Sequence, residues 1–302
     1  MKTNSLSRRQ FLGTSAVLAG AALFSPLGLL SVEKTKRTAV DQVALGKTGL
    51  KCSRLGFGSG SNSGNVQRGL GQEAFNRLIH YAYDQGITFI DCAQSYRTLD
   101  WIGPAIKGLP REKLLIQSKI PGNAQDVLAA IDQQRKIYNT DYLDSMLVHC
   151  MVKNGWTDDF KRTLDAFNEA KEKKWIRAKG VSCHSLPALQ AATASDWTDI
   201  HLVRVNPQGA HIDTPAETWN AKSEPTHLDA VLKEIKTMHA KGHGVIGMKL
   251  IGDGDFKNPE DREKSIRFAM AQPEIHSVVI GFKSAAEIDE AIQRMNRALA
   301  EG

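Results

Sequence analysis

Three short stretches decide the fold, and they read Thr88-Phe-Ile-Asp91-Cys-Ala-Gln-Ser-Tyr96, then Leu115-Ile-Gln-Ser-Lys119, then Met146-Leu-Val-His149. Each is an apolar run suited to a buried strand, with an ionisable residue at its end, and segments of helical periodicity lie between them. Repeated strand–helix units are typical of a parallel sheet or barrel, in which the carboxyl ends of the strands carry the chemistry. We therefore expect Asp91, Lys119 and His149 to converge at one mouth. Tyr96 would overhang that mouth from the loop after Asp91.

The same alternation extends along the chain and predicts an α/β protein, a single (β/α)8 TIM barrel of about 250 residues. The expected strands cover residues 55–58, 88–90, 114–118, 143–148, 176–182, 202–205, 245–248 and 278–280. The expected helices cover residues 72–85, 101–107, 124–138, 158–173, 186–193, 228–241, 262–271 and 285–299. Gly46-Lys47-Thr48-Gly49 lies between two alternating runs and predicts an N-terminal β-hairpin. The connection over residues 206–225 is long and polar, which suits a substrate loop.

The N-terminus carries a twin-arginine pattern. Ser7-Arg8-Arg9-Gln10-Phe11-Leu12 precedes a moderately apolar stretch rich in alanine and glycine. The pattern resembles a Tat export signal, so we assign residues 1–35 to a Tat-like signal segment and residues 36–302 to the barrel. This resemblance implies the Tat export machinery as a partner and a periplasmic or extracytoplasmic location. An uncleaved membrane anchor and a chance basic start are the alternatives, and cleavage of the signal is left open.

Composition and charge limit the classes of function. Of the 302 residues, 41% are hydrophobic and 24% charged, so the chain can bury an ordinary core. The formal net charge is +6, but basic and acidic residues are mixed along the helical segments, which indicates a solvated surface rather than a nucleic-acid site. The cysteines are Cys52, Cys92, Cys150 and Cys183. None forms a Cys-x-x-Cys pair, so we expect small buried thiols, with a disulfide or an adventitious metal site as the alternative.

The residues at the predicted mouth could act together in proton transfer. A tyrosine hydroxyl has a reference pKa of about 10, so it is a poor proton donor unless that pKa moves toward neutrality. The Lys119 ammonium would lower the pKa of Tyr96 by favouring the phenolate, and Asp91 would keep the ammonium charged. Such a set protonates a carbonyl oxygen as hydride arrives, or deprotonates an alcohol as hydride leaves. Singly, the residues have ordinary explanations, such as a solvated strand end for Lys119 and a hydrogen-bonded core residue for His149.

The motifs around these residues resemble one enzyme family. The chain is similar to the aldo-keto reductase superfamily from about residue 43 to residue 298, on the strength of Asp91-x-Ala93-x-x-Tyr96, Trp101-Ile-Gly103, Ser118-Lys119 and Leu147-Val-His149. The resemblance implies a (β/α)8 barrel and hydride transfer with NADP(H), or with NAD(H), on a small carbonyl or alcohol. It also implies a catalytic tetrad. Tyr96 would be its general acid or base and Lys119 the modulator of its pKa, while Asp91 would hold Lys119 and His149 would orient the substrate.

The same resemblance implies cofactor contacts after the later strands. Ser182 would hold the nicotinamide amide, although Cys183 stands where the family usually has asparagine. Arg204 replaces the usual glutamine, Met248 the usual stacking aromatic residue and Lys249 the serine that follows it. Arg204 and Lys249 would then add positive charge beside an anionic cofactor.

Two further segments belong to the implied cofactor site. Gly252 and Gly254 would keep the loop over the pyrophosphate flexible. Lys283 and Ser284 resemble the segment that grips the adenosine 2′-phosphate, and Glu287 is a further cofactor contact. We predict no metal site and no stable protein partner.

Three functional hypotheses follow. The first is an exported oxidoreductase whose substrate is a small carbonyl or a sugar-like alcohol, with Trp101 and Trp219 as candidate pocket residues, and whose cofactor is bound before export and retained. The alternative is a non-catalytic nucleotide-binding or structural barrel. A third is a metal hydrolase built from the pairs His149-Cys150 and Cys183-His184. It is disfavoured because adjacent strand residues face opposite sides.

Overall fold

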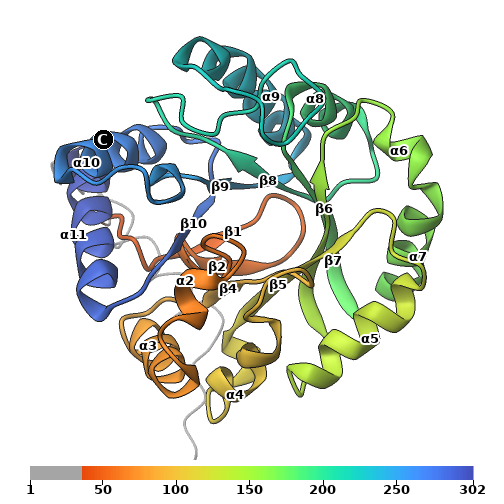
Figure 1. The fold of residues 1–302 in the computed structure, drawn as a ribbon, viewed down its shortest axis with the longest axis horizontal. Coiled ribbons are helices and arrows are strands. Elements are labelled where there is room, and N and C mark those ends of the chain that lie inside the picture. Colours follow the sequence, from red (N-terminus) through yellow and green to blue (C-terminus); the bar gives the residue numbers. More distant parts are fainter. Residues whose placement is uncertain (1–35, 302) are drawn as a thin grey trace, which may run out of the picture. The chain divides into compact units, whose positions relative to one another are not determined.

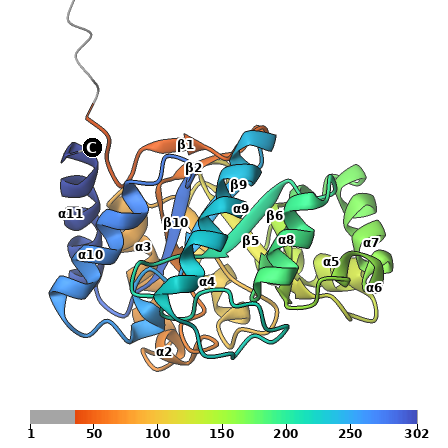
Figure 2. The same cartoon turned by 90° about the horizontal axis from the view of Figure 1, so that it is seen from above.

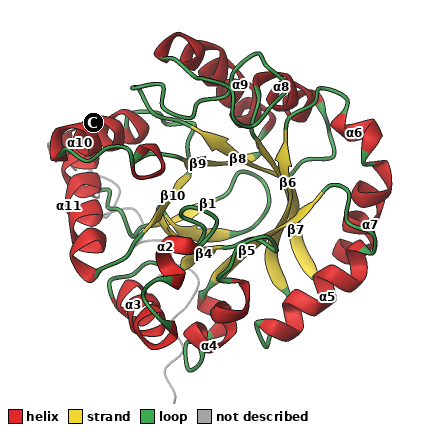
Figure 3. Cartoon of the chain, in the orientation of Figure 1, coloured by secondary structure: helices red, strands yellow, loops and turns green. Residues whose placement is uncertain are grey.

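The computed structural model describes residues 36–301, so the predicted Tat-like signal lies outside the described residues. Within them, eight parallel strands close into a barrel, and helices form a layer around it (Figures 1 and 3). The barrel strands are β3 (Leu55–Gly58), β4 (Phe89–Asp91), β5 (Leu115–Pro121), β6 (Leu143–Met151), β7 (Ile176–Cys183), β8 (Ile200–Arg204), β9 (Gly244–Met248) and β10 (Ser277–Gly281).

The outer layer consists of α-helices and short 3-10 turns. The helices are α2 (Asn65–Arg68), α3 (Gln72–Asp84), α4 (Ile102–Ile106), α5 (Val127–Ile137), α6 (Trp156–Asp159), α7 (Lys161–Glu172), α8 (Leu186–Ala194), α9 (Leu228–Lys241), α10 (Pro259–Met270) and α11 (Ala285–Glu301). The 3-10 turns are η1 (Leu99–Trp101), η2 (Arg111–Lys113), η3 (Pro225–His227) and η4 (Gly252–Gly254). In the part of the chain that the structure describes, no helix is both long and apolar enough to cross a membrane.

The strands follow one another in chain order around the barrel, and β10 closes it against β3 with Val278 opposite Leu55. The strands β1 (Gln42–Ala44) and β2 (Lys51–Ser53) form an antiparallel hairpin outside this ring. Figure 2 shows the hairpin at one end of the barrel and α2 at the other. The predicted (β/α)8 fold with its N-terminal hairpin is therefore confirmed.

The inside of the barrel is apolar at one end and polar at the other. Leu115 and Leu147 pack with Leu45 and Leu50 of the hairpin segment in one buried cluster, which seals the amino ends of the strands. Two residues further along β5 stands Gln117, and two further again stands Lys119, on the same face because strand side chains alternate. Gln117 and Lys119 therefore lie closer to the carboxyl end of β5 than Leu115, which belongs to the apolar cluster.

Several strands are longer than the sequence predicted, and β5 and β6 are extended at their carboxyl ends by three residues each. The apolar runs ended at residues 118 and 148, but β5 continues to Pro121 and β6 to Met151, so Lys119 and His149 lie inside strands. The predicted alternation also fails at Cys150, whose φ of 62° is in the left-handed region, and the pairing register with β7 shifts there. The facing argument used against the metal hydrolase therefore does not hold at this position.

The helical predictions differ mainly in short elements. The face of α3 predicted to be buried, made of Phe75, Leu78, Ile79 and Ala82, is buried. The four-residue helices α2 and α6 were not predicted, because four residues are too few to establish a 3.6-residue period. The expected helix over residues 158–173 is accordingly two helices that meet at Phe160.

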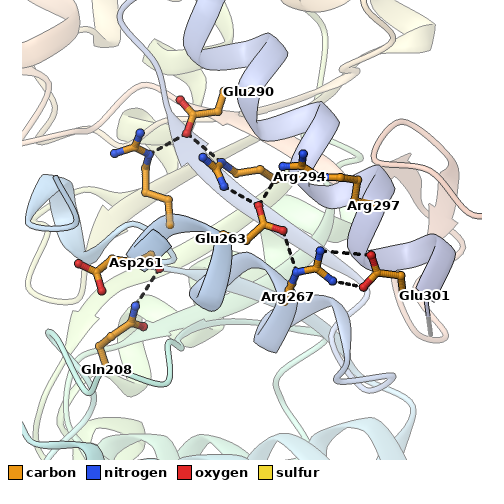
Figure 4. Close-up of polar contacts among 9 residues, drawn as sticks. Gln208, Asp261, Glu263, Arg267, Glu290, Arg294, Arg297 and Glu301 are labelled. Atoms are coloured by element: carbon orange, nitrogen blue, oxygen red, sulfur yellow. Dashed lines mark hydrogen bonds and ion pairs between the residues drawn. The ribbon is translucent and has the colours of Figure 1, made fainter. Parts of the chain in front are cut away.

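An ion network joins α10 to α11 (Figure 4), and Arg262 links this network to the loop that leaves β9. Glu263 accepts from Arg294 at 2.5 Å and from Arg267 at 2.7 Å. In the same network, Arg262 donates to Glu290 at 2.9 Å and to the carbonyl oxygen of Lys257 at 2.6 Å. The outer helices therefore fix a loop at the carboxyl end of the barrel.

Candidate functional site

Asp91, Lys119 and His149 stand on three neighbouring strands at the carboxyl end of the barrel, as the sequence predicted. They belong to β4, β5 and β6. In the strand register, Asp91 is opposite Gln117, and His149 is opposite Pro121. The barrel thus brings together groups that lie almost 60 residues apart in the chain.

Lys119 is the most constrained of these residues. Its side chain is fully buried, and Nζ donates to Asp91 Oδ2 at 2.7 Å, to the Cys92 carbonyl oxygen at 2.8 Å and to the Tyr96 hydroxyl at 3.5 Å. Burial alone would lower the pKa of Lys119, but the Asp91 carboxylate and Tyr96 raise it, and the net pKa lies above its ordinary value. Lys119 is therefore a buried ammonium, and its explanation as a solvated strand end is wrong.

Tyr96 reaches Lys119 from the loop after β4. That loop is fastened to β5, because the Gln94 N–H donates to the Lys119 carbonyl oxygen at 2.9 Å. Gly60 approaches the phenol ring so closely that a Cβ on it would lie 2.1 Å from a ring carbon of Tyr96. A glycine is required at this position, and its close approach fixes where the ring lies.

The pKa of Tyr96 moves in the direction opposite to the one predicted. Burial raises the pKa of Tyr96, and although the Lys119 ammonium lowers it, the net pKa lies above its ordinary value. The nearby Asp91 carboxylate also works against the phenolate. The error arose because the sequence identified the ammonium but could not give the desolvation of the ring and its carboxylate neighbour.

His149 completes the tetrad from β6. Its ring lies edge-on to the Tyr96 ring, with centroids 5.6 Å apart, and its Nδ1 is 3.3 Å from the Ser95 hydroxyl. Burial, with a smaller effect of the Lys119 ammonium, lowers the pKa of His149 to about 3. The imidazole is therefore neutral near pH 7 and can donate one hydrogen bond from the nitrogen that carries the proton.

Two polar residues that the sequence did not single out form a hydrogen-bonded chain that reaches the tetrad at Asp91. Gln117 Nε2 donates to Asp91 Oδ1 at 2.8 Å, and the Ser145 hydroxyl donates to Gln117 Oε1 at 3.0 Å. Both side chains are fully buried. The position of Gln117 could have been predicted from the sequence. Gln117 is two residues before Lys119 on a predicted strand, so the two side chains must lie on the same face.

A cavity of about 390 Å³ lies between the loop after β4 and the segment that leads from β5 into α5, and none of the four tetrad residues lines it. Gln94, two residues from Tyr96, and Pro121, opposite His149 in the register, belong to its wall. The rest of the lining comes from Asn123, Ala124, Gln125, Asp126, Ala129, Ala130 and Gln133. Side-chain amides and one carboxylate therefore share the lining with a proline and three alanines, and the polar groups can hydrogen-bond a ligand that carries hydroxyl groups.

The residues implied as cofactor contacts occupy the strand ends across the barrel. Ser182 is fully buried, with its hydroxyl 3.3 Å from His184 Nε2. Met248 is half-buried at the end of β9, and Lys249 pairs with Asp253 at 3.0 Å. Gly252 and Gly254 both have left-handed backbone angles, so they shape the turn η4 rather than merely loosening it.

Arg204 makes internal contacts that the sequence did not predict. It is buried, and it pairs with the buried Asp213 through Nε at 2.6 Å and Nη2 at 2.5 Å. It also donates to the carbonyl oxygens of His184 and Trp219. Arg204 therefore fastens the loop after β8 to the barrel, and Asp213 offsets the positive charge expected beside a cofactor.

Lys283, Ser284 and Glu287 form the start of α11. The Lys283 ammonium is 64% exposed and 3.6 Å from the Glu287 carboxylate, which also accepts from the Lys283 N–H at 2.9 Å. The Ser284 hydroxyl accepts from the Glu287 N–H at 3.3 Å, as a helix cap does. With Lys249, this segment offers two lysines that suit an anionic nucleotide, each partly neutralised by a carboxylate.

Only one of the two tryptophans suggested for a pocket is accessible. Trp101 is in the core, where it packs on Phe75 at 5.7 Å and under the Arg68 guanidinium at 4.2 Å, so its assignment to a substrate pocket is wrong. Trp219, in the loop after β8, is 63% exposed. Trp219 lies in a predicted loop, and Trp101 is the first residue of a short expected helix over residues 101–107, so the sequence did not show which side of either ring is buried.

The cysteines are free thiols in this structure, and Cys52, Cys92 and Cys183 are buried as expected. Within residues 36–301, no group of three or more histidine, cysteine or acidic side chains is arranged to hold a metal ion.

Comparison with known proteins identifies similar chains. A family model described as the aldo/keto reductase family matches residues 54–266. An aldo-keto reductase of Bacillus subtilis is 26% identical over an alignment of length 173 that covers 51% of this chain and 50% of that protein. L-galactose dehydrogenase of Arabidopsis thaliana is 24% identical over an alignment of length 297 that covers 84% of this chain and 88% of that protein.

Similar folds occur among solved structures. A structure of an aldo-keto reductase from Pseudomonas aeruginosa superposes with a TM-score of 0.67 and 22% identity, covering 87% of this chain and 98% of that chain. At this level of identity the likeness concerns the fold.

The low pKa of His149 predicts a pH dependence of stability. Between about pH 6.5 and pH 3 the unfolded imidazole binds a proton that the folded one does not, so the free energy of unfolding should fall as the pH falls through this window. From pH 7 to pH 5 we expect this group to contribute a loss of about 1 to 2 kcal/mol, which the substitution His149→Asn should remove. Denaturant titrations at several pH values measure it.

His80 on α3 provides the matched control, since His80→Asn also deletes an imidazole but far from the barrel mouth. An unchanged pH slope in His149→Asn would contradict the assignment of a buried neutral imidazole at this position.

Proposed function

Because the chain belongs to the aldo/keto reductase family, whose model matches residues 54–266, we propose that it transfers a hydride between NADP(H) and a carbonyl or alcohol substrate. Tyr96 is the general acid in reduction and the general base in oxidation. The observation that carries the proposal is the buried ammonium of Lys119, which contacts Asp91 on one side and the Tyr96 hydroxyl on the other. This arrangement provides a proton donor whose conjugate base has a fixed cation beside it.

Carbonyl reduction requires a proton on the oxygen as hydride reaches the carbon. The bound nicotinamide supplies the hydride. Tyr96 carries its proton at neutral pH, since the ordinary pKa of tyrosine is about 10 and the pKa of Tyr96 lies above that value. The phenolate left behind is stabilised by the Lys119 ammonium at 3.5 Å, and solvent then restores the phenol. Alcohol oxidation runs through the same groups in reverse.

His149 orients the substrate oxygen in this mechanism. The Ser95 hydroxyl, 3.3 Å from Nδ1, can donate to that nitrogen. The ring proton then resides on Nε2, which becomes a donor for the carbonyl oxygen. A neutral imidazole suits this role, because it fixes the oxygen without competing with Tyr96 as the acid.

NADP(H) is the proposed cofactor, with NAD(H) as the second choice. Lys283, the exposed cation at the start of α11, is the proposed partner of the 2′-phosphate. Its pairing with Glu287 lowers the charge available to the phosphate, so NADP(H) must compete with this carboxylate for Lys283. Ser182, Met248, Lys249 and Gly252 are the proposed contacts of the remainder of the cofactor. Arg204 pairs with Asp213, so its proposed role at the cofactor site is to hold the loop after β8 in place.

A sugar-like carbonyl or alcohol is the proposed substrate class. The cavity between the loop after β4 and α5 presents amide groups and the Asp126 carboxylate, which can hydrogen-bond hydroxyls. A relative that aligns over most of its length is named L-galactose dehydrogenase, and the sugar in that name belongs to the substrate class proposed here. Trp219 is an exposed aromatic surface on which a sugar ring could stack.

Export completes the proposal. The twin-arginine pattern at Arg8 and Arg9 supports export by the Tat machinery to the periplasm or another extracytoplasmic place, with the leader either cleaved or kept as an anchor. Nicotinamide cofactors are not expected to be plentiful there. The cofactor would therefore be bound in the cytoplasm and retained, and paired substrates would reduce and oxidise it in turn.

The first prediction concerns the proton donor. Tyr96→Phe should lower kcat for carbonyl reduction by about 100-fold or more, because it removes the general acid. Binding of NADPH, followed by fluorescence, should change by less than about twofold, since the hydroxyl is not needed to hold the nucleotide. Tyr81→Phe is the matched control, because Tyr81 donates to Asp289 at 2.7 Å away from the barrel mouth.

If Tyr96→Phe turns over like the wild type, Tyr96 is not the acid. If neither protein transfers hydride but both bind NADPH, the alternative of a non-catalytic nucleotide-binding barrel is correct.

The second prediction concerns the substrate class. The wild type should have a higher kcat/KM for sugar-sized carbonyls than for two- or three-carbon ones. Asn123→Ala should lower the value for the sugar-sized compound by about three- to tenfold, as expected for one lost hydrogen bond, and leave the short compound unaffected. Gln85→Ala, on the exposed outside of the barrel, is the control. Equal losses for both sizes would rule out a hydroxyl-binding role for this cavity.

The third prediction concerns export and the cofactor. Protein produced with its own leader should be recovered outside the cytoplasm, and replacement of Arg8 and Arg9 by lysine should keep it inside. Denaturation of the exported protein should release about one NADP(H) per chain, identified by mass spectrometry, if the bound cofactor is retained during export. Release of NAD(H) would reverse the proposed preference, and exported protein that is empty yet active with added NADPH would refute retention.

A further inference from the structure

Both oxygens of the Asp91 carboxylate have buried partners. Oδ2 accepts from Lys119 at 2.7 Å, and Oδ1 accepts from Gln117 Nε2 at 2.8 Å. The second contact continues inward, because Gln117 Oε1 accepts from the Ser145 hydroxyl at 3.0 Å. A directed chain of hydrogen bonds therefore runs from β6 through β5 to the carboxylate, and from there to Lys119 and Tyr96.

We propose that Gln117 is a positioning residue for the proton donor, which acts by holding the Asp91 carboxylate aimed at Lys119, and that Ser145 fixes the orientation of Gln117. The proposal rests on the proposed function of the tetrad and adds to it a residue that touches neither substrate nor cofactor. It explains why a glutamine is buried in the barrel one layer below Lys119.

The positioning role of Gln117 follows from which groups donate and which accept in this chain of hydrogen bonds. A serine hydroxyl can donate to the amide oxygen of Gln117, and in doing so it turns the amide nitrogen toward Asp91. An N–H donor favours the ionised carboxylate, and the ionised carboxylate favours the Lys119 ammonium. Without this donor, one oxygen of the buried Asp91 carboxylate would have no partner, and the orientation of the carboxylate toward Lys119 would be less well fixed.

The second buried glutamine of this region provides a matched control. Gln134 on α5 is also buried and accepts from the Ser118 hydroxyl on the outer face of β5, but it does not contact Asp91. Ser118 precedes Lys119 and faces the helices, whereas Gln117 and Lys119 face the barrel interior. Gln134→Leu therefore measures the general effect of replacing a buried glutamine without touching the tetrad.

The experiment compares Gln117→Leu, Gln117→Glu, Ser145→Ala and Gln134→Leu in the full-length protein. We expect Gln117→Leu to lower kcat by about 10- to 100-fold, the range for a hydrogen bond to a charged group, with KM within about twofold of wild type. Ser145→Ala should lower kcat less, because Gln117 keeps its contact with Asp91. Gln134→Leu should retain the wild-type kcat even if its melting temperature falls.

Gln117→Glu gives a signature that simple packing would not produce. Glutamate has nearly the same shape as glutamine, and in its protonated form it can still donate to Asp91. Once ionised, it places a second carboxylate against Asp91 and adds negative charge near Tyr96. The ratio of the kcat of Gln117→Glu to that of the wild type should therefore be highest at acidic pH and fall as the pH rises.

A readout independent of turnover separates this proposal from the proposed function. Absorbance of tyrosinate, taken as the difference between each protein and its Tyr96→Phe counterpart, reports the ionisation of Tyr96 directly. In Gln117→Glu this ionisation should move to higher pH than in the wild type, because the added carboxylate opposes the phenolate.

The outcomes are distinct. A wild type without hydride transfer refutes the proposed function, and the tyrosinate titration still decides the role of Gln117. An active wild type accompanied by an equally active Gln117→Leu, by an equal loss of kcat in Gln134→Leu, or by an unshifted tyrosinate titration in Gln117→Glu refutes the role of Gln117 alone.

Discussion

The buried ion pair between Lys119 and Asp91 is the interaction on which the rest of the structure depends. Removing an ammonium and a carboxylate from water costs several kcal/mol for each ion, so the pair is tolerated only if every remaining donor and acceptor finds a partner. The Cys92 carbonyl oxygen, the Tyr96 hydroxyl and the Gln117 amide are those partners. The two charges therefore require polar groups around them inside the barrel. The loop that carries Tyr96 supplies two of these groups, the Cys92 carbonyl oxygen and the Tyr96 hydroxyl.

The fold separates stability from chemistry along the same strands. Leu115 and Leu147 seal the amino ends with the hairpin, while Lys119 and His149 lie further along the same two strands at the open end. The loops around that end are fixed rather than free, since Arg204 holds the loop after β8 and outer helices hold the loop after β9. A rigid rim around a buried cation suits a reaction in which a proton and a hydride must arrive at adjacent atoms.

The fold and the tetrad could be predicted from the sequence because both rest on local patterns. Alternating strand and helix signals define the barrel, and ionisable residues at three successive strand ends indicated where Asp91, Lys119 and His149 would meet. The charge pairing of Arg204 and the pKa of Tyr96 could not be predicted, because each depends on contacts that the local sequence does not show. Nothing near Arg204 shows that Asp213 neutralises it. The raised pKa of Tyr96 depends on burial, which a motif does not give. Gln117 is the intermediate case, since alternation alone places it beneath Lys119.

Whether the Lys119 ammonium supports hydride transfer is tested most directly by following deuterium from NADPH labelled at the transferring position of the nicotinamide. We expect the wild type to deliver the deuterium to the former carbonyl carbon of the substrate. Lys119→Met, which keeps the length of the side chain without its charge, should deliver almost none in the same time, because Tyr96 loses the cation that stabilises its phenolate. An unlabelled product from the wild type, or transfer by Lys119→Met at the wild-type rate, would contradict the account.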